Sequence, residues 1–144
     1  MVYEAEARFS RFRDDSAVSH LNRERMFVDV DLAVVTALAL AFRDDTDSAF
    51  DPTIGAAMIS AGYDCTFETI TTRPVFAASA TTVQPHVAIH GACVTLRGDG
   101  LIDLGGIVKG WTVDRIAAHA GASAWLIDGG GNLRVGGDAL PATG

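Results

Sequence analysis

A carboxylate, a pair of glycines and a lysine lie close together at residues 102–114, which read IDLGGIVKGWTVD. The apolar residues around Asp103 are typical of a strand, and those after Gly106 have the spacing of a helix. A helix N-terminus has backbone N–H groups without intrahelical partners and a partial positive charge. Glycines let a ligand approach these groups, and Lys109 adds a full positive charge. The junction therefore predicts a site for a phosphorylated ligand, or for magnesium together with a phosphate.

The junction does not match the common nucleotide-binding motifs. Its glycines do not follow the spacing G-x-G-x-x-G, and Lys109 precedes a glycine where a Walker A loop has Ser or Thr. On the residues alone, a structural turn between a strand and a helix, with Lys109 at the surface, remains the alternative. Asp103 favours a ligand site, because a carboxylate between two apolar residues has no evident structural role.

The composition argues against several other classes of function. A net charge of −7 disfavours nucleic-acid binding, which needs clustered Lys and Arg to neutralise phosphates. Cys65 and Cys93 lack the spacing and the histidine neighbours of a zinc site, and we interpret them as small buried side chains, with a disulfide as the alternative. The longest apolar run, residues 32–42, is shorter than the roughly 20 residues of a membrane span.

Helical periodicity dominates the first third of the chain. Residues 2–13 form one apolar stripe among charges, which predicts an amphipathic helix. Asp15 or Ser16 is the expected N-cap of a short turn that follows. Asp31 is the expected N-cap of a helix over residues 32–42, and this helix should lie buried between layers because it is apolar nearly all round.

Strands and helices are mixed in the remainder of the chain. We predict helices over residues 53–60 and 107–120, and strands over residues 87–89, 93–96, 101–104, 125–127 and 133–135. Residues 98–100 should form a hairpin turn into the strand at 101–104, and Gly121 should occupy the C′ position of the second helix. This order favours one α+β domain with a mixed or antiparallel sheet and packed helices.

Four segments carry a resemblance to a known family. They are residues 9–22 (FSRFRDDSAVSHLN), residues 48–55 (SAFDPTIG) followed by GYD at 62–64, residues 102–114, and residues 127–133 (IDGGGNL). In this order they are similar to the motifs of the ApbE-type flavin transferases, the FAD:protein FMN transferases, which are also called thiamine biosynthesis lipoproteins. The resemblance implies a T-fold-like α+β domain and favours a ligand site at residues 102–114.

The resemblance also implies an activity. The family moves FMN from FAD to a threonine hydroxyl of an acceptor protein, with AMP as the leaving group and Mg²⁺ assisting. FAD would then be the substrate, Mg²⁺ the cofactor and a flavin-acceptor protein the partner. The protein must position the hydroxyl and neutralise the charge that develops on the phosphate oxygens.

Particular residues match the family positions that contact the ligand. The resemblance implies FAD contacts from Phe12, Ala49, Phe50, Asp51, Asp103 and Lys109, and a metal contact from the backbone of Gly106. Two of these have clear structural alternatives, since Phe12 could belong to the core and Asp51 could brace the turn at Pro52. Catalytic residues are expected in a C-terminal part of the family that has no match here.

Two family segments have no counterpart in this sequence. One is an N-terminal strand with a Met-Gly-Thr-like segment, and the other is a C-terminal H-x-[IV]-[DN]-P-x-T-G block followed by the Asp and Thr residues that hold magnesium. We therefore expect residues 1–144 to be a single partial flavin-transferase domain that binds magnesium poorly and transfers little FMN. A non-catalytic FAD-binding module and a structural remnant are the alternatives. The resemblance suggests an extracytoplasmic, often lipid-anchored enzyme, although residues 1–144 show no lipobox or signal peptide that would support this expectation.

Overall fold

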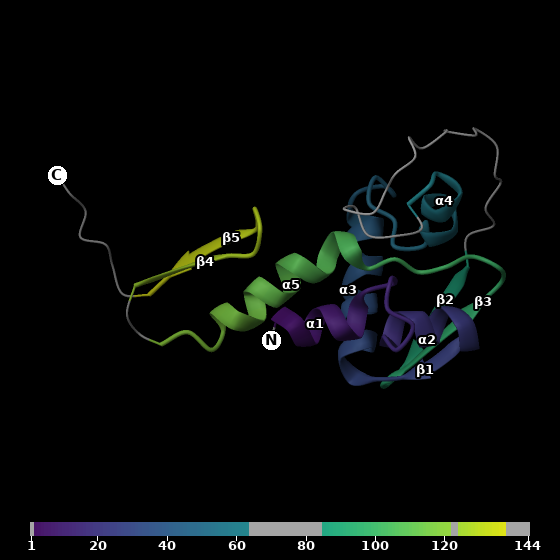
Figure 1. Cartoon of the computed structure of the whole chain (residues 1–144), viewed down its shortest axis with the longest axis horizontal. Coiled ribbons are helices and arrows are strands. Elements are labelled where there is room, and N and C mark those ends of the chain that lie inside the picture. Colours follow the sequence, from purple (N-terminus) through teal and green to yellow (C-terminus); the bar gives the residue numbers. More distant parts are fainter. Residues whose placement is uncertain (1, 64–84, 122–123, 138–144) are drawn as a thin grey trace.

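The computed structural model describes residues 2–63, 85–121 and 124–137, which form an α+β fold (Figure 1). The helices are α1 (Val2–Phe9), α2 (Ala17–Glu24), α3 (Val30–Asp45), α4 (Gly55–Ser60) and α5 (Gly105–Ala117). The strands are β1 (Met26–Val28), β2 (His86–His90), β3 (Cys93–Arg97), β4 (Trp125–Asp128) and β5 (Leu133–Gly136). The strands make small antiparallel sheets against which the helices pack, so the predicted fold class is confirmed.

The larger sheet has the strand order β1-β3-β2, with β3 in the centre. Strands β2 and β3 form a hairpin through a two-residue turn, in which Gly91 has a φ of 58°. The predicted strand at residues 101–104 is wrong: Leu101 makes one isolated parallel bridge with Ile54, and residues 102–104 are not in a strand. The backbone groups of this segment have other partners, because Asn22 bonds both the N–H and the carbonyl of Ile102 and the Asp103 N–H donates to the Pro52 carbonyl.

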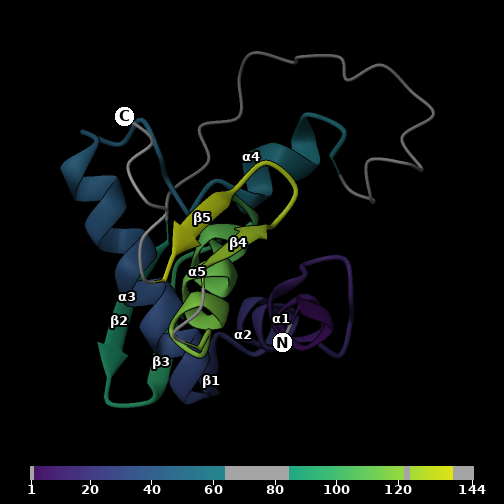
Figure 2. The same cartoon turned by 90° about the vertical axis from the view of Figure 1, so that its left-hand side faces the viewer.

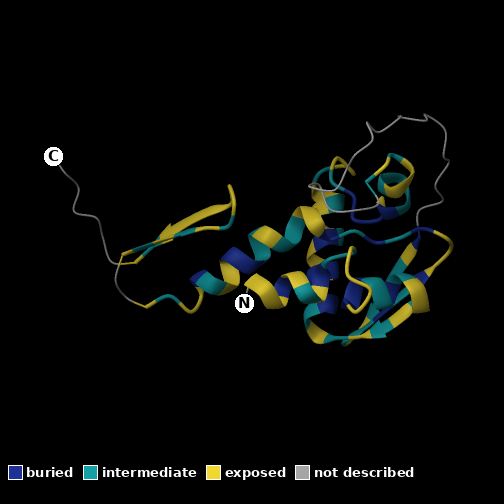
Figure 3. Ribbon diagram, viewed as in Figure 1, coloured by how far each residue is buried: buried dark blue, intermediate teal, exposed yellow. Residues whose placement is uncertain are grey.

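The hydrophobic core lies where the helices pack against the three-stranded sheet (Figure 3). Helix α5 lies between α3 and α1 (Figure 2). The rings of Phe9 and Trp111 join α1 to α5 edge to face, with their centroids 5.4 Å apart. The buried apolar residues are Ala5, Phe9, Ala17, Val18, Leu21, Leu32, Ala33, Val35, Ala39, Val94, Leu96, Ile102 and Leu104.

Helix α3 begins earlier than the sequence predicts, and its N-cap is Asp29 rather than Asp31. Asp29 has an extended backbone, and its side chain accepts a hydrogen bond of 2.8 Å from the Leu32 N–H. The strand β1, which the sequence did not predict, ends at Val28. Asp29 is the next residue, and it keeps an extended backbone as an N-cap does. Asp31 lies in the first turn, where it pairs with Arg8 and Arg115.

Two other predicted helix boundaries also differ from the structure. Helix α1 ends at Phe9, so Phe12 lies beyond the helix. Helix α5 begins at Gly105 and ends at Ala117, and its C-cap is Ala118 in a right-handed helical conformation, so Gly121 is not at C′. Where the sequence predicted only a short turn, the structure has the helix α2, and Ser16 is its N-cap, accepting a hydrogen bond from the Ser19 N–H at 3.0 Å.

The smaller sheet is the hairpin of β4 and β5, which packs against α5. Gly129 is needed at this contact, because a Cβ there would lie 2.5 Å from Val113 Cγ2 on α5. Cys93 is a free thiol in β3, and Cys65 lies outside the described residues. Among the described helices, none has the length and apolar character that crossing a bilayer requires.

Candidate functional site

A cleft of about 410 Å³ opens where the segment after α1, the segment before α4 and the N-terminus of α5 meet. Its lining residues are Arg11, Phe12, Ala49, Phe50, Asp51, Ile54, Met58, Tyr63, Asp103, Gly105 and Gly106. Apart from Lys109, each residue for which the sequence predicts a ligand or metal contact lies in this lining. Three of the four sequence motifs, separated along the chain, thus converge on one cavity.

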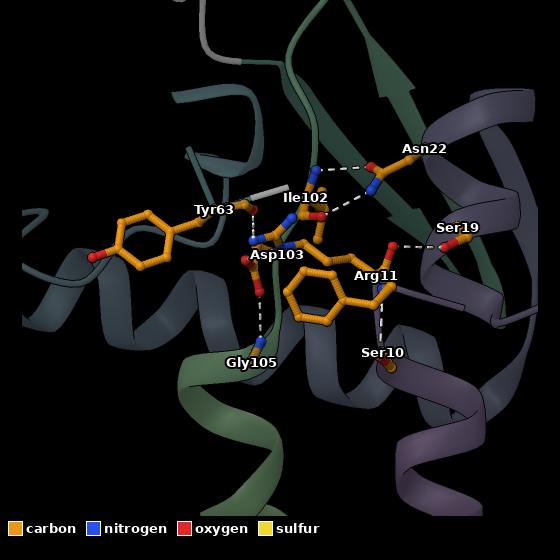
Figure 4. Close-up of polar contacts among 9 residues, drawn as sticks. Ser10, Arg11, Ser19, Asn22, Tyr63, Ile102, Asp103 and Gly105 are labelled. Atoms are coloured by element: carbon orange, nitrogen blue, oxygen red, sulfur yellow. Dashed lines mark hydrogen bonds and ion pairs between the residues drawn. The ribbon is translucent and has the colours of Figure 1, made fainter. Parts of the chain in front are cut away.

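Asp103 lies two residues before α5, and both of its carboxylate oxygens have protein partners (Figure 4). Oδ1 accepts the Gly105 N–H at 2.8 Å, and Oδ2 accepts the Nε–H of Arg11 at 2.7 Å. The Asp103 side chain is 16% exposed and that of Arg11 is 10% exposed. Asp103 therefore has a structural role that its sequence context did not reveal, although each oxygen keeps a lone pair directed elsewhere.

Arg11 is a site residue that the sequence reasoning did not single out. Its guanidinium also donates through Nη2 to the Tyr63 carbonyl, and its Cζ lies 4.2 Å from the centroid of the Phe12 ring. The signal that could have found it is its place beside Phe12 in the motif at residues 9–22. The pairing itself could not be read from the sequence, because Asp103 is 92 residues away.

Asn22, at the end of the same motif, holds the segment before α5 against α2. Its Nδ2 donates to the Ile102 carbonyl and its Oδ1 accepts the Ile102 N–H, both at 2.8 Å (Figure 4). The Asp103 N–H donates to the Pro52 carbonyl at 2.8 Å. These bonds fix the backbone from which the Asp103 side chain projects.

Asp51 is buried, and its carboxylate braces the turn that precedes α4. Its Oδ1 accepts the Thr53 N–H at 2.8 Å and the Thr53 hydroxyl at 2.6 Å. The Nε of Arg43 lies 3.6 Å from Oδ2. The structure thus shows the bracing role that the sequence left as an alternative, and the FAD contact of Asp51 stays a prediction.

The aromatic residues of the cleft differ in burial. Phe12 is 42% exposed, so it does not belong to the core. Phe50 is partly buried against the core, and a Cβ built on Gly106 would lie 3.0 Å from its Cε2. Gly106 therefore makes room for the Phe50 ring, which gives this glycine a structural reason independent of any ligand.

The N-terminus of α5 is open to solvent. Its N-cap, Leu104, has no side chain able to accept a hydrogen bond, and both Gly105 and Gly106 are exposed. Lys109 lies one turn into the helix, is exposed, and has no hydrogen-bond or ion-pair partner among the described residues. Asp103 accepts the first N–H of α5, and the rest of this exposed N-terminus, at the edge of the cleft, is electrostatically suited to an anion.

The described residues do not by themselves fit a magnesium ion. No group of three or more His, Cys, Asp or Glu side chains is arranged around a common point in the described ranges. Asp51 and Asp103 are paired with arginines. The carbonyl of Gly106 lies inside α5, where it points along the axis toward Gly110. The predicted metal contact of Gly106 therefore gains no support from this geometry.

The comparisons with known proteins agree on one family. The family model described as the ApbE family matches residues 1–143, which is nearly the entire chain. The chain belongs to the ApbE family. Its resemblance to ApbE-type flavin transferases, inferred above from four motifs, is thereby confirmed.

Solved ApbE structures are similar in fold to this ApbE-family chain. The flavinyl transferase ApbE of Pseudomonas stutzeri, in its apo form, has a TM-score of 0.81 and 20% identity, covering 94% of this chain and 46% of that one. An ApbE protein of Thermotoga maritima has a TM-score of 0.73 and 23% identity, covering 92% and 47%. The flavin transferase ApbE of Vibrio cholerae has a TM-score of 0.63 and 23% identity, covering 81% and 40%.

The chain thus spans less than half the length of the solved ApbE proteins that it resembles. At these identities the likeness establishes the fold and not the chemistry. A comparison with curated protein sequences gives no match.

Proposed function

We propose that this chain is the FAD-binding part of a flavin transferase that moves FMN from FAD to a threonine hydroxyl of an acceptor protein. The observation that carries the proposal is the convergence of Phe12, Ala49, Phe50, Asp51, Asp103 and Gly106 on one cleft beside the α5 N-terminus. These residues come from separate segments that resemble the family's FAD-contacting motifs. Membership of the ApbE family supports the same assignment.

The proposed reaction is a phosphoryl transfer. The threonine Oγ forms a bond to the flavin-side phosphorus of FAD, the phosphoanhydride bond breaks, and AMP leaves with the electron pair while the hydroxyl proton passes to a base. Such a reaction depends on positioning and on neutralising charge at the phosphate oxygens. We place the diphosphate at the exposed Gly106 end of α5 with Lys109 one turn further on, and the flavin against Phe12. The Gly105 N–H is already bonded to Asp103 and is not part of this contact. None of the described residues is assigned as the base.

Magnesium dependence belongs to the proposal through the family resemblance alone. When bound, the ion would supply charge neutralisation at the phosphate oxygens. Because the described residues do not form a magnesium site, we derive no step through the metal. We expect this chain to bind FAD, to bind magnesium poorly, and to transfer little FMN. An extracytoplasmic location and a flavin-acceptor partner are further parts of the proposal.

The proposal is tested by titrating the chain with FAD and following flavin fluorescence. Phe12 is half exposed, so Phe12→Ala should leave the fold intact, yet remove a ring contact worth about 0.5–1.5 kcal/mol. The expected result is a Kd raised by about two- to tenfold. Tyr3→Ala is the matched control, because Tyr3 is an aromatic residue that is 87% exposed on α1 and does not line the cleft.

Two outcomes would contradict the proposal. Absence of saturable FAD binding would favour a structural remnant, and equal effects of Phe12→Ala and Tyr3→Ala would place FAD outside this cleft. Incubation with FAD, magnesium and an acceptor protein, followed by in-gel flavin fluorescence, tests the expected lack of transfer. Rapid covalent labelling would show that the chain supplies a metal site and a base that we have not identified.

A further inference from the structure

Arg11 occupies the boundary between two clefts. It lines the 410 Å³ cleft and also a second cleft of about 280 Å³, formed with Ser19, Asn22, Ile59 and Leu101 among others. Its side chain is only 10% exposed, although it comes from the connecting segment between α1 and α2. A buried guanidinium in a connection is held there by specific contacts, since its desolvation is otherwise costly.

Three contacts define where the guanidinium lies. Its Nε donates to Asp103 Oδ2 at 2.7 Å, its Nη2 donates to the Tyr63 carbonyl, and its Cζ lies over the Phe12 ring at 4.2 Å from the centroid. The Arg11 backbone is held as well, because its carbonyl accepts the Ser19 hydroxyl at 3.4 Å (Figure 4). The guanidinium is planar and rigid, so its edge and its face are fixed together.

This geometry couples two walls of the candidate site. The edge of the guanidinium sets the orientation of the Asp103 carboxylate, whose other oxygen receives the first N–H of α5. The face of the same group supports the Phe12 ring, which is 42% exposed. The Nη1 group has no hydrogen-bond partner among the described residues, so the coupling is made by Nε, Nη2 and the ring face.

We propose that Arg11 is the positioning residue of the FAD cleft, holding the Asp103 carboxylate and the Phe12 ring in the arrangement that the ligand meets. This inference rests on the proposed function for the identity of the ligand. It adds that the role depends on the shape of the guanidinium as well as on its charge. A lysine at this position carries the charge, but a single ammonium cannot bond Asp103 and Tyr63 edge-on while covering a ring with a flat face.

The test compares Arg11→Lys and Arg11→Gln with the parent chain, measuring the FAD Kd by fluorescence and the thermal midpoint without ligand. Both variants should raise the Kd about tenfold or more, because neither side chain can bond Asp103 and the Tyr63 carbonyl edge-on while covering the Phe12 ring with a flat face. Arg13→Gln is the matched control. Arg13 lies two residues away and pairs with Asp15 at the surface, where the two side chains are 47% and 71% exposed. The FAD Kd of Arg13→Gln should therefore equal that of the parent.

A double-mutant cycle separates positioning from a merely structural role. If Arg11 acts through Asp103, then Arg11→Gln introduced into Asp103→Asn should raise the Kd by a clearly smaller factor than it does in the parent. Equal factors in both backgrounds, or a parent-like Kd for Arg11→Lys, would overturn the proposal. A loss of FAD binding that matches a loss of fold in both variants would also overturn it, by making Arg11 a residue of stability alone.

The result for the parent chain distinguishes this inference from the proposed function. If the parent binds FAD and the Arg11 variants bind it equally well, only the positioning role is wrong. If the parent does not bind FAD, the proposed function fails, and the role of Arg11 toward that ligand fails with it.

Discussion

At the scale of single residues, Asp103 shows why a charge in an apolar context is ambiguous. Its position between Ile102 and Leu104 suggested a ligand contact, because no structural purpose was visible in the sequence. The structure supplies one, since the carboxylate bonds the first N–H of α5 and the Arg11 guanidinium. The same pair lies in the lining of the cleft, so a structural role and a ligand role are compatible at this residue.

Thr36 carries a second prediction at the residue scale. It is fully buried in α3, and its hydroxyl has no hydrogen-bond partner among the described residues. A buried hydroxyl without a partner loses its hydrogen bonds to water on folding and gains none within the protein, which lowers the free energy of unfolding. Thr36→Val keeps the shape of the side chain, and we expect it to raise the free energy of unfolding by about 1 kcal/mol, measured by urea denaturation.

Thr112 in α5 is the matched control for this change. It is also buried and helical, but its hydroxyl donates to the Val108 carbonyl at 2.8 Å. Thr112→Val removes that bond and should not stabilise the chain. A stabilisation of equal size by both substitutions would mean that valine is favoured at each site for reasons unrelated to the unpaired hydroxyl.

At the scale of elements, the N-terminus of α3 tests which aspartate caps the helix. Asp29 bonds the Leu32 N–H and pairs with Arg8 at 2.5 Å, whereas Asp31 forms only partly exposed ion pairs. Asp29→Ala should lower the free energy of unfolding by about 1 kcal/mol or more, because the cap is lost. Asp31→Ala should lower it by at most about 1 kcal/mol, as surface ion pairs contribute little. If Asp31→Ala proved the more costly change, Asp29 would not be the cap.

The pH dependence of stability provides an independent check on Asp29. Burial acts to raise the pKa of Asp29, but the Leu32 N–H and the Arg8 guanidinium outweigh it and hold the pKa below its ordinary value of 3.8. A carboxyl with a lowered folded-state pKa stabilises the fold above its unfolded-state pKa, and the contribution is lost as the pH falls through the folded-state value. Urea midpoints should therefore fall less steeply below pH 3.8 in Asp29→Asn than in the parent.

At the scale of the whole molecule, α3 has one face in the core and another face that the described residues leave uncovered. Val30, Val34, Leu38 and Phe42 recur every four residues along the helix and are 66%, 50%, 37% and 48% exposed. The sequence predicted burial on all sides, because the helix is apolar nearly all round. The chain spans less than half the length of the ApbE structures it resembles, and the described residues cover only one side of α3.

Neighbouring valines of α3 make this difference measurable. Val34 is half exposed and Val35 is fully buried. Val34→Lys should change the free energy of unfolding by less than about 0.5 kcal/mol, as surface substitutions do, whereas Val35→Lys should prevent folding because it buries an unpaired charge. Urea denaturation of the purified chain at low concentration measures both. A severe loss of stability in Val34→Lys would show that this face of α3 is covered in solution.

Local features were readable from the sequence because their causes are local. The apolar spacing in α3 and α5, the serine that caps α2 and the strands β4 and β5 depend on residues within a few positions of one another. The motifs were recognisable for the same reason. They indicated the family and a set of residues that the fold then brought to one cleft, although whether those residues bind FAD stays a prediction.

Only the tertiary structure decided how distant segments meet. The hydrogen bond from Arg11 to Asp103 joins residues 92 positions apart, and the bonds between Asn22 and Ile102 join residues 80 positions apart. No local pattern encodes such pairs. The segment at residues 101–104 has the composition of a strand, but its backbone bonds Asn22 and Pro52 instead of a neighbouring strand. Tertiary structure also decided which aspartate caps α3. The residues of β1 pair with β3 as far as Val28, so the helix can begin only after that residue, and Asp29 becomes its N-cap.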